Sequence, residues 1–453
     1  MCGIAGVFNN DHASQYVFLQ IYSLQHRGQE SAGICTFDGT DLRVVRKAGR
    51  VLEKIDQSDL DYLRGSVAIG HVRYSTAGDS GGLNAQPIVR ETRFGKLAVV
   101  HNGNLTNHAL LREEVTSRGI GLNHSSDTEL FLALLDLSEK DDLESALIEV
   151  LGKVEGAYSI LLISGNKLIA ARDPMGFRPL LIGRRDDTVL FASESCAFDI
   201  VEGELIREVE PGEVVVVDGE GMRSYFPFKS ERRSMCIFEF VYFSRPDSYI
   251  FGEWAYRVRK DLGRRLALED DTEADLVVPV PDSGVVPAIG YAQEKGIPFE
   301  MGLIRNHYVG RSFIEPTEEL RNLRVLMKLS PNRSVLEGKR IIVIDDSLVR
   351  GTTSRRIVSM LRRAGAGEIH LRIASPPVVG PCYYGIDTPT REELIANRMS
   401  LEEIRNFIGV DSLRYLSLEG LRSCVRDRHS FCDACFSNEY PVEVEKTALI
   451  RRR

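Results

Sequence analysis

Residues 340–354 read RIIVIDDSLVRGTTS, and this stretch decides the fold expected for the second half of the chain. The apolar, β-favouring run IIVI predicts a buried strand, with Asp345 and Asp346 at its carboxyl end. A helix is then expected to open at Gly351, Thr352, Thr353 and Ser354. Open α/β sheets bind ligands at this edge, where backbone N–H groups and threonine hydroxyls can hold a phosphate. Two carboxylates beside a bound phosphate would repel it. The acidic pair is therefore expected to bind something else, such as ribose hydroxyls or a cation. An acidic cap before a glycine loop would explain each residue separately but not their spacing.

The sequence around this stretch alternates between strand-like and helical runs. Strand-like runs at 274–284 and 368–377 alternate with helical runs such as SRRIVSMLRRAGA. This alternation indicates parallel βαβ units. A long basic segment from Arg305 to Arg333 interrupts them, and connections of this length are usually disordered or functional lids. We therefore expect residues 229–453 to form a parallel-sheet domain.

The first half of the chain has a different pattern. Short β-rich runs such as SVAIGHVRYST and KLAVVHNGNL are separated by Gly, Asn and Asp turns. Helical runs are few, and the longest are at 14–27 and 127–151. This pattern predicts packed antiparallel sheets with helices on their outer faces. The charged run at 226–235 has no apolar periodicity, so we place the end of this first domain at residue 228.

The overall composition is that of a globular protein. The 453 residues suggest two or three domains. The 57 Lys and Arg against 65 Asp and Glu give a net charge of −8, which argues against nucleic-acid binding through bulk electrostatics. No run approaches the ~20 apolar residues of a membrane span and no signal-peptide pattern is present, so we expect a cytoplasmic protein. Eight cysteines in so long a chain are not a disulfide framework and are expected to be buried, catalytic or metal-bound.

Cys2 follows the initiator methionine in MCGIAGVF. Removal of Met1 would leave a thiol and a free α-amine on one residue. An α-amine with a pKa of about 7.7 to 8.0 can act as the base for a thiol with a pKa of about 8.5. A nucleophile activated by an amine on the same residue is a recognised catalytic arrangement. The alternative is that Cys2 is only a small buried hydrophobic residue.

Three further stretches of the first half carry candidate site residues. Arg73 ends a probable strand and offers a planar fork of donors for a carboxylate, the alternative being a surface salt bridge. Asn102 and Gly103 follow an apolar run, which favours either a hairpin turn or an oxyanion hole. Asp127 precedes an apolar run as a helix N-cap would, and capping is its alternative role.

These stretches carry a resemblance. In order and near the usual spacing, the chain is similar to the glutaminase domain of N-terminal-nucleophile amidotransferases, an αββα sandwich, in the motifs CGIAGVF, LQHRGQESAGI, HVRYSTAG, NAQP, HNGNLTN, SSDTE, EGAYS and ARDPMGFRPL. The resemblance implies that Cys2 attacks the side-chain amide of glutamine while its α-amine moves the protons. It also implies that Asn102 and Gly103 stabilise the oxyanion. Arg73 and Thr76 would hold the substrate's α-carboxylate end, and Asp127 would hold its α-ammonium. The products would be ammonia and glutamate, and His71 and Tyr74 are expected only to line the wall.

The stretch at 340–354 resembles the phosphoribosyl-pyrophosphate motif of type I phosphoribosyltransferases. The resemblance implies that Asp345 and Asp346 bind the ribose hydroxyls and help to hold Mg²⁺, one per subunit. The loop Gly351, Thr352, Thr353 and Ser354 would bind the 5-phosphate. The loop at Asp282, Ser283 and Gly284 would receive pyrophosphate, with Ser283 also in the metal shell. The basic segment from Arg305 onwards would be the lid, in which Leu326 replaces a residue that is commonly basic.

A glutaminase followed by a phosphoribosyltransferase is identified as a member of the glutamine phosphoribosylpyrophosphate amidotransferase family. The resemblance implies that ammonia passes internally to C1 of the ribose, which gives phosphoribosylamine in the first committed step of purine synthesis. It further implies purine nucleotides as feedback inhibitors and a homotetramer. A rival hypothesis is a non-catalytic regulator that senses a nucleotide, but such a protein would not need Cys2, Arg73, Asn102 and Asp127 together.

Four cysteines are assigned only by this resemblance. Cys432 and Cys435 form a C-x-x-C pair, which by itself indicates half of a zinc site, a redox pair or nothing, with zinc favoured over iron–sulfur. The resemblance reverses this order, because one branch of the family carries a 4Fe–4S cluster, one per subunit, on cysteines in the contexts of Cys236, Cys382, Cys432 and Cys435. Its expected role is to fix the C-terminal segment to the body of the protein. Cys35, Cys196 and Cys424 have no such match.

Overall fold

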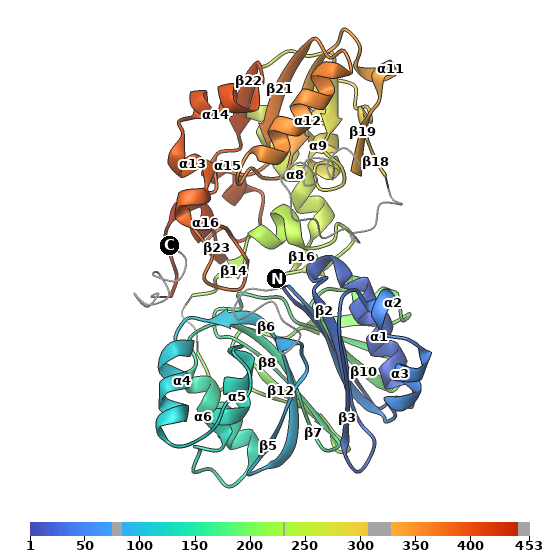
Figure 1. Cartoon of the computed structure of the whole chain (residues 1–453), viewed down its shortest axis with the longest axis vertical. Helices are drawn as coiled ribbons and strands as arrows, with labels where there is room; N and C mark the ends of the chain where they lie inside the picture. The colour runs from blue at the N-terminus through green and yellow to red at the C-terminus, as the bar shows by residue number, and fades with distance from the viewer. Residues whose placement is uncertain (75–83, 230–231, 307–327, 443–453) are drawn as a thin grey trace.

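The computed structural model describes residues 1–74, 84–229, 232–306 and 328–442. The first half of the chain forms two antiparallel sheets that pack face to face (Figure 1). The first sheet has the order β11-β9-β10-β1-β4-β2-β3. Its strands are β1 (Gly3–Phe8), β2 (Ser31–Phe37), β3 (Leu42–Ala48), β4 (Val67–Arg73), β9 (Leu181–Arg185), β10 (Thr188–Ala192) and β11 (Glu204–Glu208). The second sheet has the order β13-β12-β8-β7-β6-β5. Its strands are β5 (Ile88–Thr92), β6 (Gly95–Leu105), β7 (Gly156–Ser164), β8 (Lys167–Arg172), β12 (Val214–Asp218) and β13 (Gly221–Tyr225).

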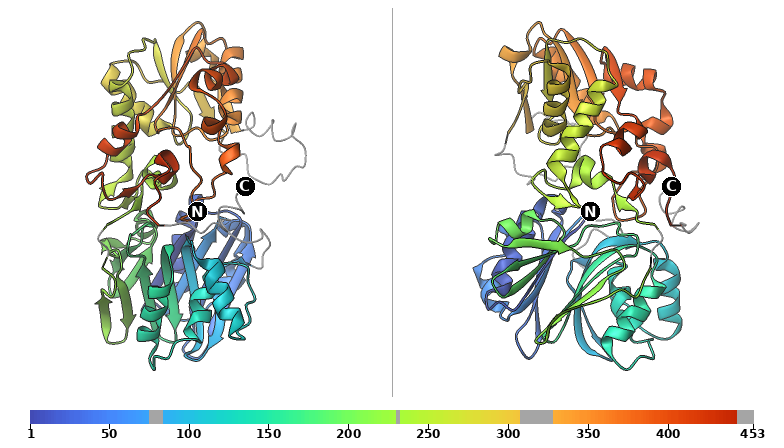
Figure 2. Two further views of the ribbon diagram at one scale, coloured as in Figure 1. Left: turned by 90° about the vertical axis from the view of Figure 1, so that its left-hand side faces the viewer. Right: turned by 180° about the vertical axis from the view of Figure 1, so that it is seen from behind.

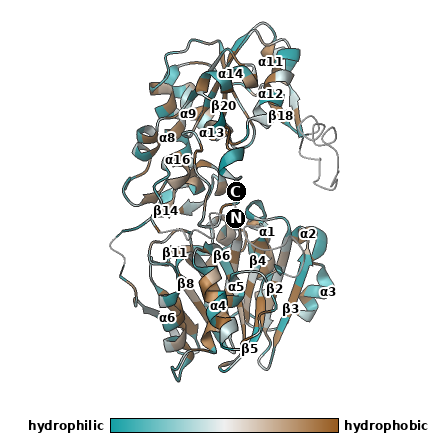
Figure 3. Ribbon diagram, turned by 60° about the vertical axis from the view of Figure 1, so that its left-hand side comes forward, coloured by the Kyte–Doolittle hydropathy of each residue, from teal (hydrophilic) through white to brown (hydrophobic). Residues whose placement is uncertain are grey.

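Helices cover the outer face of each sheet. The first sheet carries α1 (Ala13–Ser23), η1 (Gln25–Arg27), α2 (Val51–Lys54), α3 (Gln57–Tyr62) and α7 (Cys196–Asp199), and the second carries α4 (His108–Ser117), α5 (Thr128–Leu135) and α6 (Leu143–Lys153). Separate apolar clusters fill the space between the sheets and under each helical layer. The strands therefore carry brown, hydrophobic stretches in Figure 3. This αββα sandwich confirms the fold expected for the first half.

One helical prediction needs a correction. The run at 127–151 was expected to be continuously helical, but the structure divides it into α5 and α6. The polar stretch between them ends at Asp142, whose side chain accepts a hydrogen bond of 2.9 Å from the Ser145 N–H and so caps a new helix.

The second half contains a four-stranded parallel sheet of order β17-β20-β21-β22. Its strands are β17 (Leu276–Pro279), β20 (Arg340–Asp345), β21 (Glu368–Ile373) and β22 (Ser412–Tyr415). Along β20, Ile342 and Ile344 join the apolar cluster formed with α8 (Ala255–Leu268) and α9 (Val285–Lys295). The alternate residues Ile341 and Val343 join the cluster formed with α12 (Thr352–Arg363) and α14 (Leu401–Ile408). Helices on both faces of a parallel sheet confirm the predicted α/β fold.

Short elements connect the two halves. β14 (Met235–Cys236) pairs in parallel with β23 (Phe431–Cys432), so that the end of the chain returns to the start of the second half. The π-helical turn η3 (Glu239–Phe243) and the hairpin of β15 (Tyr249–Ile250) with β16 (Glu253–Trp254) follow β14. The remaining elements are β18 (Leu303–Arg305), β19 (Leu329–Pro331), α11 (Arg333–Leu336), η4 (Arg391–Glu393), α13 (Ile395–Arg398), α15 (Leu418–Ser423) and α16 (Ala434–Ser437).

The two halves are stacked along the long axis, and the N-terminus lies at their junction (Figure 2). The start of the chain therefore lies next to the elements that join the two halves. None of the helices that the structure describes has the length and apolar character needed to span a bilayer.

Candidate active site

The first candidate site lies where β1 begins. Cys2 is buried, and its Sγ donates a long hydrogen bond of 3.6 Å to the carbonyl oxygen of Tyr74. The carbonyl of Cys2 accepts a hydrogen bond of 2.9 Å from Nε of Arg27. Met1 is only 1 % exposed, and burial lowers the pKa of its amine to about 6. The Met1 amine is therefore mostly unprotonated at neutral pH.

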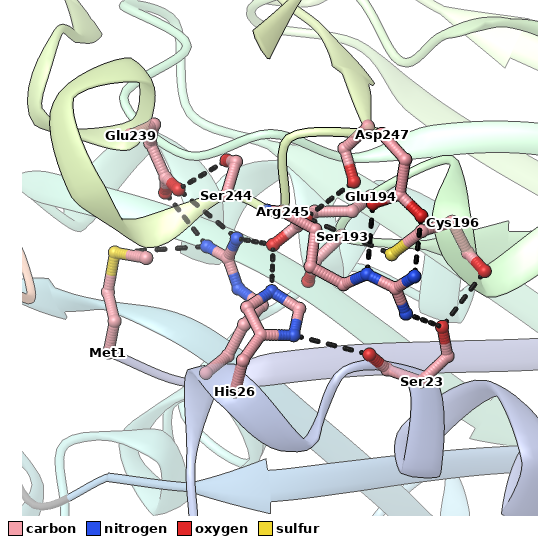
Figure 4. Close-up of polar contacts among 12 residues, drawn as sticks. Met1, Ser23, His26, Ser193, Glu194, Cys196, Glu239, Ser244, Arg245 and Asp247 are labelled. Carbon is pink, nitrogen blue, oxygen red and sulfur yellow. Dashed lines mark hydrogen bonds and ion pairs between the residues drawn. The ribbon is translucent and has the colours of Figure 1, made fainter. Parts of the chain in front are cut away.

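A network of buried charges surrounds this end of β1. Figure 4 shows Met1 and His26 with the carboxylates Glu194 and Glu239. Arg27 forms ion pairs with both carboxylates, at 2.8 Å to Glu239, and His26 lies 2.7 Å from Glu194. The side chains of Arg27, Glu194 and Glu239 have no exposed surface. Removal of one member would leave an unpaired buried charge, which typically costs about 3–5 kcal/mol.

The predicted oxyanion residues lie within a strand. Asn102 and Gly103 pair with Ser159 and Tyr158 in the middle of the β6–β7 ladder, so the hairpin-turn alternative is wrong. Asn102 is 0 % exposed, and neither its Nδ2 nor its Oδ1 has a hydrogen-bond partner among the described residues. A Cβ on Gly103 would lie 2.0 Å from the carbonyl oxygen of Ala157, so only glycine fits there.

The predicted substrate-binding residues lie at two element ends. Arg73 ends β4 and is buried, which removes the alternative of a surface salt bridge. Asp127 occupies the N-cap position of α5, but its side chain makes no capping hydrogen bond and instead accepts from the Leu105 N–H at 2.9 Å. Burial alone would raise the pKa of Asp127, but the neighbouring His101 and the Leu105 N–H outweigh it and lower the pKa to about 2. Thr76 lies outside the residues that the structure describes.

Some contacts of this site go beyond what the local sequence indicates. Tyr74 was expected to line the wall, but it contacts the Cys2 thiol through its backbone carbonyl. His71 is buried with Nε2 at 3.2 Å from the carbonyl of His101. Arg27 belongs to the motif LQHRGQESAGI. Nothing in this local sequence indicates that the partner of Arg27 is Glu239, which lies 212 residues away.

The second candidate site lies at the carboxyl end of β20. Asp345 and Asp346 are both buried. Burial and the neighbouring Asp346 raise the pKa of Asp345 well above its ordinary value, and burial also raises that of Asp346, an effect opposed by the hydroxyls of Ser283 and Ser347. Two buried carboxyls that disfavour ionisation are typical of a site that a cation completes.

Two loops meet beside this acidic pair. Gly351 adopts a left-handed conformation at φ +74° and starts α12, with Thr352 and Thr353 exposed and Ser354 buried. In the other loop, Gly284 starts α9, and a Cβ there would lie 2.4 Å from the carbonyl oxygen of Ile344. The structure thus brings Ser283 and Gly284 to the end of β20.

Asp282, in the same loop, is largely exposed and forms an ion pair with Arg305. The lid predicted from Arg305 to Arg333 begins on β18, but residues 307–327, Leu326 among them, lie outside the described part of the chain.

The third feature is a cavity lined by four cysteines. Its lining residues include Cys236, Cys382, Cys432 and Cys435. Cys236 and Cys432 lie opposite each other in the β14–β23 pair. All four are free thiols, and burial raises the pKa of Cys236 to about 11 and those of Cys432 and Cys435 well above the ordinary value. The buried guanidinium of Arg178 lines the same cavity and opposes the rise at Cys236.

A single zinc ion sets a narrow spacing for its thiolate ligands. A zinc ion with Zn–S bonds of about 2.3 Å would bring its thiolates to about 3.8 Å from one another. Among the described residues, no three His, Cys, Asp or Glu side chains are grouped so as to hold a metal ion. In the part of the chain that the structure describes, the four thiols therefore share a cavity without being preformed around a metal group.

Comparisons with known proteins cover the whole chain. Residues 71–199 match the family model of the glutamine amidotransferase domain, and residues 255–374 match that of the phosphoribosyl transferase domain. Amidophosphoribosyltransferase 1, chloroplastic, of Arabidopsis thaliana is 51% identical over 99% of this chain and 80% of its own length. Amidophosphoribosyltransferase of Bacillus subtilis is 47% identical over 99% of this chain and 96% of its own length.

Solved structures agree with the sequence relatives. The glutamine phosphoribosylpyrophosphate amidotransferase from B. subtilis, complexed with ADP and GMP, superposes with a TM-score of 0.93 at 47% identity over 98% of both chains. A structure described as the allosteric regulatory enzyme of purine biosynthesis has a TM-score of 0.95 at 46% identity, covering 100% of this chain and 99% of that one.

Proposed function

Since this chain belongs to the amidophosphoribosyltransferase family, we propose that its two candidate sites carry out successive halves of one reaction. The activity is the glutamine-dependent amidation of phosphoribosyl pyrophosphate in purine biosynthesis. Glutamine, water and phosphoribosyl pyrophosphate give glutamate, 5-phosphoribosylamine and pyrophosphate. The first half releases ammonia from glutamine, and the second uses that ammonia to displace pyrophosphate from C1 of the ribose.

Cys2 is the proposed nucleophile of the first half. After removal of Met1, its thiol attacks the side-chain amide of glutamine and forms a thioester, and water later releases glutamate. The free amine takes the thiol proton and passes it to the departing ammonia. Burial lowers the pKa of the Met1 amine in the unprocessed chain, and the same buried surroundings would favour an unprotonated amine on Cys2 after Met1 is removed.

The observation that carries this half is the side chain of Asn102, which has no hydrogen-bond partner among the described residues. Burying an amide without a partner costs about 1–3 kcal/mol per group, and folded proteins rarely tolerate it without a functional reason. The Nδ2 of Asn102 with the N–H of Gly103 would donate to the oxyanion of the tetrahedral intermediate. The partner that none of the described residues provides would thus be supplied by the reacting substrate.

Binding of the rest of glutamine is assigned to the surrounding side chains. Arg73 would bind the α-carboxylate, with Thr76 as a second contributor. Asp127 would bind the α-ammonium, and its low pKa supports this assignment because the carboxylate stays ionised throughout the physiological range.

The second half is assigned to the end of β20. Asp345 and Asp346 would bind the ribose hydroxyls, and the 5-phosphate would bind to Gly351, Thr352, Thr353 and Ser354. Pyrophosphate would bind at Asp282, Ser283 and Gly284. Mg²⁺ would be held by Ser283, Asp345 and Asp346, where it would neutralise charge on the leaving pyrophosphate. The pair of buried carboxyls fits such an ion, since hard cations prefer oxygen ligands.

The cysteine cavity is proposed to hold a 4Fe–4S cluster on Cys236, Cys382, Cys432 and Cys435. The donor set fits, because four thiols share one cavity with a buried arginine whose charge would offset a negatively charged group. The cluster would cross-link segments from both ends of the second half, and no catalytic step is assigned to it.

The domain boundary, the inhibitors, the assembly and the location of the protein are also proposed. The boundary at residue 228 is supported by the gap between β13, which ends at Tyr225, and β14, which starts at Met235. Purine nucleotides are proposed to inhibit the enzyme, as the B. subtilis structure with ADP and GMP suggests. A homotetramer and a cytoplasmic location stay predictions from the sequence.

One assay separates this function from that of a non-catalytic regulator. Purified protein is incubated with Mg²⁺, glutamine and phosphoribosyl pyrophosphate, and glutamate and pyrophosphate are measured. We expect both products in equal amounts. Binding of phosphoribosyl pyrophosphate without turnover, by a preparation confirmed to lack Met1, would instead support the regulator.

A further inference from the structure

Residues Cys382 to Gly385, here called the bridging segment, join the cysteine cavity to the strand that carries the oxyanion residues. Cys382 lines the cavity at one end of the segment. At the other end, Gly385 packs directly on Gly103: a Cβ on Gly385 would lie 2.9 Å from the carbonyl carbon of Gly103 and 3.0 Å from its Cα and oxygen. Gly385 also has φ +103°, a conformation that favours glycine.

A hydrogen bond fixes the next residue of the same strand. The Nδ2 of Asn104 donates to the carbonyl oxygen of Tyr383 at 2.8 Å, and both residues are buried. Two consecutive residues of β6, Gly103 and Asn104, are therefore held by two residues of the bridging segment that are only two positions apart.

Tyr384, in the middle of the bridging segment, is itself fixed from both sides. Its ring stacks on Phe177 with centroids 4.3 Å apart, and its hydroxyl donates to the Val442 carbonyl at 2.9 Å. Its carbonyl accepts hydrogen bonds of 2.9 and 2.5 Å from the guanidinium of Arg178.

Arg178 also connects the bridging segment to the nucleophile. It lies 3.4 Å from Glu239, which pairs with Arg27 at 2.8 Å, and Arg27 donates to the Cys2 carbonyl. One short segment thus contacts the oxyanion strand directly and the backbone of the nucleophile through buried ion pairs.

We propose that Gly385 and Asn104 are positioning residues for glutamine cleavage, because they hold the N–H of Gly103 where the oxyanion forms. The inference rests on the proposed oxyanion role of Gly103. Neither residue binds substrate in this account, and each acts only through the position of β6. Ordinary packing between the halves would also place atoms in contact, but it would not make the rate of glutamine cleavage depend on these two residues in particular.

The test compares two glycines of similar conformation. Gly385→Ala forces a Cβ against Gly103, whereas the control Gly39→Ala has φ +98° and no atom within 4 Å of the added Cβ. Backbone strain is thus similar in both variants, and only one of them displaces the oxyanion strand. Since a misplacement of about 1 Å can cost 10²-fold in rate, we expect Gly385→Ala to lower kcat with glutamine by roughly 10-fold or more.

The readouts separate positioning from general damage. In Gly385→Ala, the KM for glutamine, the rate with ammonium salt and the iron content should match those of Gly39→Ala. Asn104→Ala should show the same selective loss of kcat, and it decides the question if Gly385→Ala fails to fold. Equal loss of the glutamine and ammonia reactions, or full kcat with glutamine in a folded variant, would overturn the inference.

Cys2→Ala separates this inference from the proposed function. If Cys2→Ala abolishes the glutamine reaction while Gly385→Ala and Asn104→Ala keep it in full, the nucleophile is correct and the positioning role is wrong. If Cys2→Ala keeps the glutamine reaction, the proposed function has failed on its own.

Discussion

Replacement of Asn102 by leucine should lower activity and leave the fold at least as stable. Asn102 is fully buried, and its two side-chain polar atoms have no partner among the described residues. Each unsatisfied buried polar group costs about 1–3 kcal/mol, so an apolar side chain of similar size removes a penalty. Loss of one oxyanion donor costs about 10²–10³ in kcat, or roughly 2.7–4 kcal/mol of transition-state stabilisation.

The assay for Asn102→Leu measures kcat with glutamine and the unfolding temperature of the same preparation. We expect kcat to fall by about 10²–10³, with an unfolding temperature no lower than that of the wild type. The matched control is Asn107→Leu, because Asn107 donates to the Lys153 carbonyl at 2.9 Å and accepts from the Glu155 N–H at 3.1 Å. That variant should lose stability. A clear loss of stability in Asn102→Leu, or an unchanged kcat, would refute the oxyanion assignment.

Three further predictions address the other groups. Joint replacement of Asp345 and Asp346 by Asn should abolish pyrophosphate release from both glutamine and ammonia, and activity with either nitrogen source would contradict the site. The rate with glutamine should fall towards acid pH, because the amine base of Cys2 is inactive once it is protonated, whereas Asp127, with a pKa of about 2, stays ionised throughout the physiological range and adds no acid limb there. The ammonia reaction, normalised to the concentration of free NH₃, should lack this limb, and a shared limb would argue against the amine. Anaerobically purified protein should be brown with about four irons per chain and should lose fold or solubility in oxygen; colourless, zinc-containing and fully active protein would exclude the cluster.

Much of the fold could be predicted from local sequence. The continuous burial along β20 and the position of Asp345 at its end follow from the apolar run and the acidic pair that ends it. The break between α5 and α6 could not be predicted from apolar periodicity, because it depends on one capping side chain, Asp142.

The candidate site could be predicted in part from single motifs, which name Cys2 and Asp127; both side chains are buried in the structure, and their roles stay predictions. It was not predictable where distant residues meet in space. Glu239 pairs with Arg27 across 212 residues, and Tyr383 accepts a hydrogen bond from Asn104 across 279. Such contacts depend on how the two halves pack, which no local pattern encodes. The same reason explains why Asn102 and Gly103 suggest a turn in sequence and form part of a strand in the structure.

We propose that the Cys2 thiol and its amine act only in releasing ammonia. The most direct test measures pyrophosphate release with glutamine and with ammonium salt for the wild type, for Cys2→Ala and for a form shown by mass to keep Met1. We expect Cys2→Ala to lose the glutamine reaction and keep the ammonia reaction. The form with Met1 should show the same split, with a fall of at least about 10²-fold, because a peptide bond removes the amine that acts as the base. Glutamine-dependent turnover by Cys2→Ala, or loss of its ammonia reaction while it remains folded, would contradict the account.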